Sequence, residues 1–580
     1  MVRGLLSKQR CLPLLVSVLC ATGMIFSLPS EAKAAVDQPR CETGPEATRP
    51  ADVYVPVDSW IYPALDRLRA LGYADTAFLG LRPWTRRSIQ RVLMETAQEK
   101  GIQDRAQAYE TLTALQREFG DEENDATGLS YACEGLYTRL QGITGLTLRD
   151  SFHLGQTLIN DYGRPYQPGF NTVDGVAGSG EFGRFSLYAR GEFQHAPSAA
   201  GYSPTLFETL STIDGVPLAS NPVQATIPEG PIASTNDFHV LEANLSYRLL
   251  NHEISFGKSD HWMAPTKAGS FLYSNNAQNI YAFQIDRTEP LYVPLLSRLT
   301  GPFRYDFFVG SLKGHSDPND PWLHTEKISF KPTANVEMGF ARSTIWGGKG
   351  HVPITLHTFL KSFFSFQNVS VAEKNSRGDP GARFGTFDFS WRLPFLSHRL
   401  TLYSDSLVHD DVSPIDAPRH AGVRPGLYLS QFPGIPRLDL RVEGVNTDPP
   451  TSRSIGGQYL YAEYVQVQGY TNDGFIMGDA IGREGKGGQA WLTYHLSPSE
   501  MVQFSYRHAK NAKDFIPSGT TQNSFDIHVV KLLPNHLELS GDVQREWWKA
   551  PVYQPGEQTD TVATFQLTLH PALGRSKGSH

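Results

Sequence analysis

The sequence predicts an all-β transmembrane barrel of about 18 antiparallel strands with a small N-terminal α-helical module. Three observations predict it: an export signal, a long series of segments in which apolar and polar residues alternate, and connections that are alternately short and long. The alternation is clearest at residues 437–443, where Leu438, Leu440 and Val442 are interleaved with Arg437, Asp439, Arg441 and Glu443. A period of two puts these sets on opposite faces of a strand, so in a barrel wall one face contacts lipid and the charges face the lumen.

The N-terminus has the pattern of a cleaved signal peptide over residues 1–34. Three basic residues precede an apolar stretch from Cys11 to Leu28, and Ala32-Lys33-Ala34 supplies small residues before a cleavage site at Ala35. The alternative is an uncleaved membrane anchor. Elsewhere no apolar run reaches the roughly 18 residues of a spanning helix. An exported chain of this kind is either soluble or a membrane barrel.

Composition narrows the class of protein. The formal net charge is −7, so there is no basic excess and nucleic acid is not an expected partner. The 52 glycines, 11% aromatic residues and mean hydropathy of −0.32 suit a β-rich chain with long polar loops. Cleavage of the signal peptide leaves Cys41 and Cys133, which form one disulfide in an oxidising compartment or remain two unpaired thiols.

A leader over residues 35–54 precedes a predicted periplasmic helical module at 55–140. The first helix begins at Asp58 or Ser59, either of which can cap it, and stops at Gly72. The second follows Pro83-Trp84 with Thr85 as its cap, and the third runs from about Asp104 to Phe119. Their apolar stripes have helical spacing, which predicts a compact bundle.

Part of this module resembles a single S-layer-homology repeat. The resemblance lies in residues 57–65, with Trp60 and Tyr62, and in Pro83-Trp-Thr-Arg86. Such repeats bind cell-wall polymers, so the resemblance implies contact with peptidoglycan through Trp60 and Arg86. The alternative is that Trp60, Tyr62 and Trp84 simply pack a pair of helices.

The alternation with period two then continues to the end of the chain and defines a barrel domain at 141–570, followed by a tail at 571–580. Strands of about ten residues cross a bilayer when tilted. The expected strands are 146–159, 181–195, 236–249, 252–262, 303–313, 323–331, 334–345, 353–366, 383–393, 399–408, 421–431, 437–444, 458–467, 487–495, 500–507, 523–532, 536–544 and 563–569.

The connections between these segments favour a barrel over soluble β folds. Short ones at 250–251, 332–333 and 533–535 alternate with long ones such as 197–235 and 263–300. Short turns at one rim and long loops at the other are typical of outer-membrane barrels. A β-sandwich needs fewer strands, and a propeller would show a repeat of about forty residues, which is absent.

No motif predicts a catalytic, metal or cofactor site. The long loops instead offer aromatic and amide side chains suited to stacking on sugars and bonding to them. The candidate sugar-contacting residues are Trp262, Tyr273, Asn275, Asn276, Tyr281 and Tyr470. For any one of these aromatics the alternative is a place in the belt at the membrane interface.

Most of residues 50–570 resembles the Wzi-type capsule assembly proteins of the outer membrane. The resemblance is carried by Glu253–Trp262, Gly301–Gly310 and Pro436–Gly444, the last followed by Thr447-Asp-Pro-Pro450. It implies an eighteen-stranded barrel, a periplasmic helical bundle near its lower mouth, and surface loops that help to hold capsular or other exopolysaccharide.

The function predicted from these features is a non-enzymatic, monomeric barrel in the outer-membrane lipid that binds, anchors or organises surface polysaccharide. Arg437, Asp439, Arg441 and Glu443 are expected to form a charge network that narrows the lumen, while the helical module plugs or braces the periplasmic mouth. Two alternatives remain open. One is a porin-like diffusion channel whose helical module contacts peptidoglycan, and the other is a hydrolase embedded in the barrel.

Overall fold

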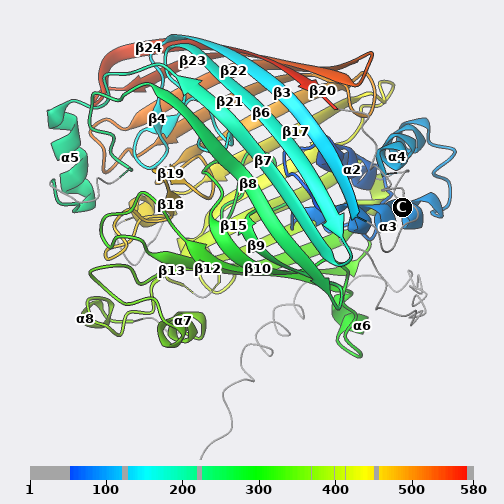
Figure 1. Cartoon of the computed structure of the whole chain (residues 1–580), viewed down its shortest axis with the longest axis horizontal. Coiled ribbons are helices and arrows are strands. Elements are labelled where there is room, and N and C mark those ends of the chain that lie inside the picture. Colours follow the sequence, from blue (N-terminus) through cyan, green and yellow to red (C-terminus); the bar gives the residue numbers. More distant parts are fainter. Residues whose placement is uncertain are drawn as a thin grey trace, which may run out of the picture. The chain divides into compact units, whose positions relative to one another are not determined.

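The barrel wall consists of 18 antiparallel strands in one closed sheet, which confirms the predicted fold class (Figure 1). The computed structural model describes residues 52–119, 129–218, 225–366, 369–396, 399–411, 413–449 and 456–570. The wall closes where the last strand pairs with the first, with Phe565 opposite Leu140. The wall strands are β3 (Leu129–Gly145), β6 (Gly169–Phe182), β7 (Phe185–Ala196), β8 (Thr235–Leu249), β9 (His252–Lys258), β10 (Tyr281–Arg287), β11 (Phe303–Ser311), β12 (Trp322–Thr333), β13 (Val336–Trp346), β14 (Ala382–Arg392), β15 (Leu400–His409), β16 (Gly422–Leu429), β17 (Leu438–Asn446), β20 (Lys486–His495), β21 (Met501–Asn511), β22 (Thr520–Leu533), β23 (Leu537–Ala550) and β24 (Gln554–Leu569).

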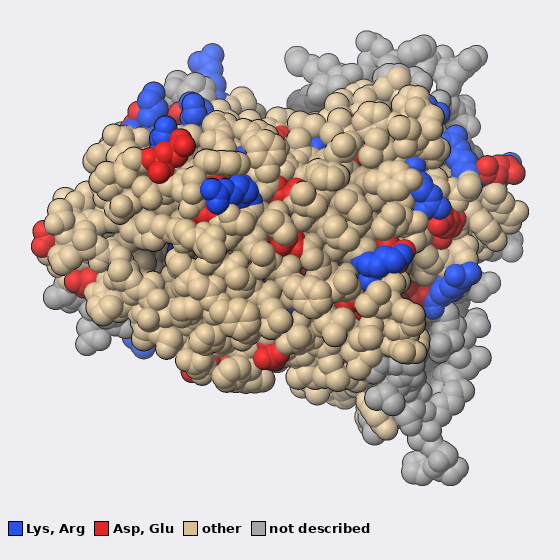
Figure 2. Space-filling view, turned by 90° about the horizontal axis from the view of Figure 1, so that it is seen from above, with Lys and Arg blue, Asp and Glu red and all other residues tan. Residues whose placement is uncertain are grey.

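The outer face of the wall is apolar. Large side chains exposed on it alternate with buried inward residues, and Figure 2 shows that charged side chains are sparse across the middle of one side. This is the pattern that a lipid-facing surface requires. Examples from around the barrel are Leu136, Phe193, Leu245, Phe256, Ile328, Val442, Leu492, Phe504, Phe525 and Val543.

Three of the expected strands are not in the wall. Residues 353–366 contain helix α7 (Leu356–Phe363), because Thr355 forms a capping box with Thr358 and the apolar residues recur at helical spacing. The segments 146–159 and 458–467 fold into the lumen instead. Their apolar residues alternate because they pack inside the barrel, and alternation alone does not distinguish that environment from lipid.

Three wall strands lie where the alternation predicts none: β3, β6 and β10. The barrel therefore begins at Leu129, inside the range expected for the helical module, rather than at 141. In β6 the signal is weakened by glycines, one of which, Gly175, lies beneath Tyr137 of β3. A Cβ at Gly175 would come within 2.1 Å of the tyrosine ring. The number of wall strands equals the number expected only because the three absent strands are offset by β3, β6 and β10.

The connections alternate in length around the barrel. One rim has turns such as 183–184, 250–251 and 334–335, whereas the other carries loops that include 197–234 and 347–381. In outer-membrane barrels the short turns mark the periplasmic side. We therefore call the long-loop end the outer mouth.

The helical module consists of α2 (Ile61–Ala70), α3 (Arg86–Ala97) and α4 (Ala106–Phe119), which pack around Leu65, Leu68, Ile89, Leu112 and Leu115. Thr85 caps α3, as predicted, by accepting the Ser88 N–H. The first helix differs, since Trp60 is at its N-cap and makes no side-chain cap. Asp58 instead pairs with Arg190 of the wall, at 2.8 Å.

The remaining elements are short and lie in the connections. None of the described helices is both long and apolar enough to cross a membrane. These elements are β1 (Tyr54–Val55), β2 (Trp84–Thr85), β4 (Arg149–Asp150), β5 (Gly155–Gln156), β18 (Thr471–Asn472), β19 (Phe475–Ile476), α5 (Pro204–Asp214), α6 (Ser297–Thr300), α8 (Val371–Lys374), and the 3-10 turns η3 (Pro394–Leu396), η4 (Pro418–His420) and η5 (Gly456–Tyr459).

Candidate functional site: a plugged lumen and its outer mouth

Three loops from the outer mouth fold into the barrel, and we call residues 146–168, 259–280 and 456–485 together the outer plug. Barrels of 16 to 18 strands are wide enough to leave a water-filled channel. Here the lumen contains an apolar core built by the plug and the inner wall. Its fully buried members include Phe152, Phe271, Tyr470 and Ile476 of the plug and Phe308, Ile345 and Phe384 of the wall.

The loops of the outer plug are bonded to one another. The Tyr162 N–H donates to the carbonyl of Asn275 at 2.7 Å, and the Ser274 N–H donates to that of Met477 at 2.8 Å. The Tyr461 hydroxyl donates to the Phe271 carbonyl at 2.7 Å. Each loop thus satisfies backbone groups of another, as buried backbone requires.

The N-terminal segment, residues 52–85, enters the lumen from the periplasmic rim and meets the outer plug. Arg82 and Trp262 exchange two backbone hydrogen bonds of 3.0 Å. The Val57 N–H donates to the carboxylate of Asp260 at 3.0 Å. The N-terminal segment and the outer plug therefore meet inside the lumen.

Charged residues of the inner wall hold the N-terminal segment by its backbone. Arg304 donates to the carbonyls of Leu81 and Pro83 at 3.2 and 2.9 Å. The carboxylate of Glu337 accepts the N–H groups of Leu79 and Gly80 at 3.0 and 2.8 Å. Hydrogen bonds that involve a charged group are stronger than neutral ones.

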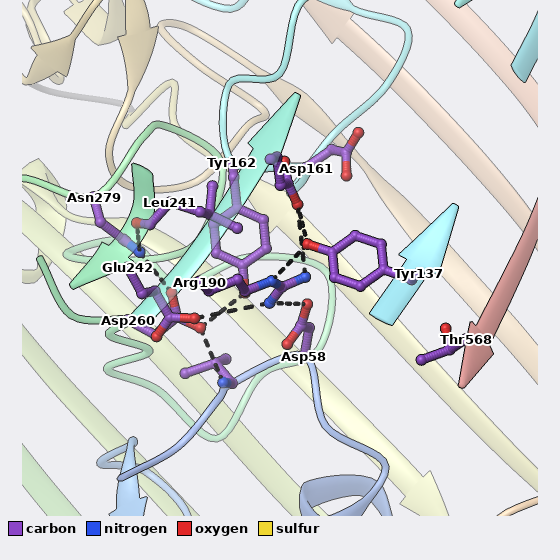
Figure 3. A network of polar contacts seen from close by, with 12 residues as sticks. Asp58, Tyr137, Asp161, Tyr162, Arg190, Leu241, Glu242, Asp260, Asn279 and Thr568 are labelled. Atoms are coloured by element: carbon purple, nitrogen blue, oxygen red, sulfur yellow. Dashed lines mark hydrogen bonds and ion pairs between the residues drawn. The ribbon is translucent and has the colours of Figure 1, made fainter. Parts of the chain in front are cut away.

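Arg190 of β7 is the centre of a buried network that joins the wall to the N-terminal segment (Figure 3). Its guanidinium pairs with Asp58 at 2.8 Å and donates to the Tyr137 hydroxyl at 2.9 Å. Glu242 of β8 lies 3.8 Å away. The network thus ties the start of the helical module to strands β3, β7 and β8.

Asp260 extends the same network into the outer plug. It accepts the Tyr162 hydroxyl at 2.8 Å and the Asn279 amide at 2.6 Å, in addition to the Val57 N–H (Figure 3). Two plug loops and the N-terminal segment therefore converge on one carboxylate. A group that is charged, buried and shared in this way is costly to leave unpaired.

Of the four charges predicted to face the lumen, Asp439, Arg441 and Glu443 are buried on the inner side of β17, whereas Arg437 precedes the strand. Asp439 contacts His495 at 2.6 Å, Arg441 pairs with Asp66 of α2 at 3.3 Å, and the more exposed Arg437 pairs with Glu110 of α4 at 3.0 Å. Glu443 accepts the backbone N–H groups of Lys267 and Ala268 in the plug, at 2.6 and 3.0 Å. They contact the module, the plug and the wall rather than one another.

Five of the six candidate sugar-contacting residues are buried. Trp262, Tyr273, Asn275 and Asn276 belong to the plug, as does Tyr470, whose hydroxyl donates to Ser343 of the wall at 3.0 Å. The prediction placed these residues on surface loops at the mouth that form no core, whereas the loops turn into the barrel and pack there. They present no open face to a sugar at the cell surface. Tyr281 is exposed, but it points outward from β10 beside Lys258, as a belt residue does.

The contact of Trp60 and Arg86 with peptidoglycan and the disulfide between Cys41 and Cys133 remain predictions. Trp60 is half-buried, and Arg86 lies over the ring of Phe119 in the module. Cys133 lies in β3, while Cys41 is outside the described residues, as are the predicted signal peptide and C-terminal tail.

The sequence profile of the capsule assembly protein Wzi family matches residues 140–563. The chain belongs to this family. A search of curated proteins found no match. Among solved structures, the chain resembles Wzi from Escherichia coli with a TM-score of 0.62 and 16% identity, covering 90% of this chain and 100% of that one. That protein is described as an outer membrane protein involved in group 1 capsule assembly and a carbohydrate-binding β-barrel.

Other solved structures resemble the chain more distantly. Acinetobacter baumannii OccAB3 has a TM-score of 0.39 and 10% identity, covering 76% of this chain and 99% of that one. Pseudomonas aeruginosa OccK5 has the same TM-score and identity, covering 76% and 98%.

The three stretches that carry the Wzi resemblance contain residues that tether the lumen contents. Asp260 lies in the first, Arg304 in the second and Glu443 in the third. Sequence reasoning missed the tethering role of Arg190, Asp260 and Arg304, because their partners are distant in the chain. The signal that was available is a charge at an inward position of an alternating strand, as in Arg190 and Arg304.

At the outer mouth of this Wzi-family barrel, His153 anchors helix α5. Its ring contacts Asp150 at 2.8 Å and Asp214, the last residue of α5, at 2.7 Å. Arg483 of the plug also pairs with Asp214, at 3.0 Å. Burial alone would lower the pKa of His153, but the two carboxylates outweigh it and raise the pKa to about 9.

Helix α5 is therefore expected to loosen as the pH rises through about 9. Because the pKa of His153 is raised on folding from 6.5 to about 9, its stabilisation is complete below pH 6.5 and is lost as the pH passes the folded value. The loss is on the order of 3 kcal/mol. A fluorophore on Thr209→Cys of α5 should show anisotropy that falls with a midpoint near pH 9.

Two controls accompany this measurement. The same label on Ala372→Cys of α8, which has no histidine anchor, should change little over this range. In a His153→Gln background the Thr209 label should be mobile already at pH 7. A pH profile that is unchanged by His153→Gln would contradict the anchoring role.

The outer plug also exposes one aromatic side chain that the sequence prediction did not single out. Tyr464 is 69% exposed, although it follows the buried Leu460, Tyr461 and Ala462. Its neighbour Glu463 accepts the N–H groups of Val465 and Gln466 and pairs with Lys374 of α8 at 2.6 Å. The ring thus stands on a fixed backbone at the outer mouth.

Proposed function

We propose that a single chain binds capsular or other exopolysaccharide at the outer mouth and organises it there without cleaving it. Membership of the capsule assembly family supports this, as does the carbohydrate binding described for the E. coli protein of similar fold. The observation that carries the proposal is the apolar core that the outer plug and the inner wall build inside the lumen. A barrel filled in this way offers a polymer a surface rather than a passage.

The contact surface we propose is centred on Tyr464. An exposed aromatic ring stacks on the apolar face of a sugar, and its hydroxyl supplies a hydrogen bond. The segment that carries it is rigidly held, since the Val467 N–H donates to the Asp317 carbonyl at 3.0 Å and the Gln466 amide donates to Gly347 at 2.9 Å. Little conformational entropy is therefore lost on binding.

The test is binding of the surface polysaccharide purified from the source strain to the protein in lipid nanodiscs. Tyr464→Ala is expected to weaken binding about fivefold or more, which corresponds to about 1 kcal/mol. Tyr281→Ala is the matched control, because that tyrosine is also exposed but points outward from the wall. It should bind like the wild type.

Other outcomes decide between the proposal and its rivals. Absence of binding by the wild-type protein would overturn the proposal. Binding that Tyr464→Ala leaves unchanged would move the contact elsewhere on the outer mouth. Shortening of the polysaccharide during incubation, followed by size-exclusion chromatography, would favour the barrel hydrolase.

A further inference from the structure

Helix α7 lies on the outside of the barrel wall, close to the outer mouth (Figure 1). Phe359 and Phe363 pack edge-on against Phe307, an outward residue of β11, with ring centroids 6.3 and 6.1 Å apart. Trp346 of β13 also points outward, yet it is only 1% exposed because Phe359 covers it. The helix therefore lies beside the barrel rather than over its opening.

Polar residues of the wall fix the helix in this position. Arg342 points outward from β13 and donates to the carbonyls of Ser362 and Phe363 at 2.6 and 3.1 Å. These carbonyls lie in the last turn of α7, where a helix leaves backbone acceptors short of donors, although that of Ser362 also accepts the Phe364 N–H. His324 of β12 bonds to the Ser362 hydroxyl at 3.0 Å, and Glu326 lies beside both wall residues. A charged side chain on the lipid-facing surface destabilises a barrel. Helix α7 covers Arg342, His324 and Glu326.

The free face of α7 is apolar. Leu356, Leu360 and Phe364 are spaced four residues apart, so they share one face of the helix and the turn that follows it. They are 73%, 42% and 65% exposed, and Phe366 adds an exposed ring above Arg342. His357 and Lys361 form a separate stripe, and Lys361 faces α8, where it is near Glu373. The apolar face continues the lipid-facing wall at Phe307 and Ile328.

From this geometry we propose that α7 lies in the interface of the outer leaflet, with Leu356, Leu360 and Phe364 in contact with lipid acyl chains. A helix with one apolar and one polar side lies in the plane of a membrane surface. Continuity with the lipid-facing wall selects lipid as the occupant, because the same bilayer already covers the adjoining strands. The loop 347–381 would then be held by the membrane as well as by the barrel.

Acyl-chain quenching tests the proposal in the full chain. In a background with the four cysteines replaced by serine, Leu360→Cys is labelled with an NBD fluorophore and the protein is reconstituted in phosphatidylcholine vesicles with 5-doxyl phosphatidylcholine. His357→Cys on the polar stripe is the matched control, and Ile328→Cys on the wall is the lipid-facing reference. Phe364→Cys repeats the test on the same face if Leu360→Cys does not fold.

We expect doxyl quenching at position 360 to exceed that at 357 at least about threefold and to fall within about twofold of that at 328. Aqueous iodide should show the opposite order. Equal doxyl quenching at 357 and 360 would overturn the proposal. Protection of position 360 from both quenchers, dependent on the protein-to-lipid ratio, would also overturn it and indicate a second copy of the chain as the occupant.

Discussion

Replacement of Arg424 by alanine is expected to open the outer plug and to produce ion conductance that the wild-type protein lacks. The guanidinium of Arg424 donates to Asp479 of the plug at 2.7 Å and pairs with Glu443 of β17 at 3.3 Å. Both carboxylates are buried, so the substitution leaves two negative charges without their cation. Breaking a buried pair in this way costs about 3–5 kcal/mol. Glu443 also binds the backbone at Lys267 and Ala268, so the disturbance reaches a second plug loop.

Single-channel recording in planar bilayers measures this effect. Arg437→Ala is the matched control, since it removes an arginine just before β17 whose pair with Glu110 is about one-third exposed on both sides. Exposed pairs contribute about 0–1 kcal/mol, so this variant should stay closed. Large, steady conductance in the wild type would refute the closed lumen and favour the porin alternative. Equal behaviour of the two variants would show that Arg424 does not hold the plug.

Replacement of Arg304 by methionine is expected to release the helical module while the barrel stays folded. Arg304 is 1% exposed, pairs with Asp286 at 3.0 Å and lies over the ring of Trp84 at 4.8 Å. It also holds the carbonyls of Leu81 and Pro83. Its loss leaves Asp286 buried without a counter-ion, at a cost of about 3–5 kcal/mol. The backbone ladder between β10 and β11 does not depend on this side chain.

Limited proteolysis of the folded protein measures the release. Cleavage between residues 52 and 128 should accelerate by about two to three orders of magnitude if it tracks the population of the open form. The double variant Arg304→Met with Asp286→Leu removes both charges and should recover much of the resistance, because replacing a whole buried pair by apolar residues is often nearly neutral. Resistance that is unchanged in the single variant would place the main anchor of the module elsewhere.

The charges at residues 437–443 illustrate how far sequence reasoning reached. The alternation correctly assigned Asp439, Arg441 and Glu443 of β17 to the lumen side, because the direction of a strand side chain is a local property, whereas Arg437 precedes the strand. Their partners are Glu110, His495, Asp66 and the plug backbone, which come from distant parts of the chain. The predicted network among the four charges is replaced by tethers to different elements. Local periodicity does not contain that information.

The aromatic residues of the loops show the same limit of local sequence patterns. Trp262, Tyr273 and Tyr470 have the composition of a sugar-binding loop, but they are core residues of the outer plug. Tyr464 lies in a segment that alternates like a strand, yet it is exposed at the outer mouth. Whether an aromatic ring is buried or free depends on where its loop packs. Loop packing is decided by contacts such as that between Tyr461 and Phe271.

Local sequence patterns were enough to predict the barrel class, most of the wall strands, the inward charges of β17 and the helical module with its Thr85 cap. All of these follow from short-range patterns: a period of two, a period of 3.6, and capping chemistry. Long-range contacts, by contrast, pack loops 146–168, 259–280 and 456–485 inside the lumen and hold the helix within residues 353–366 against the outer wall. An alternating apolar face can be buried equally well by lipid, by a plug or by a helix. The choice among them depends on long-range contacts that no local pattern records.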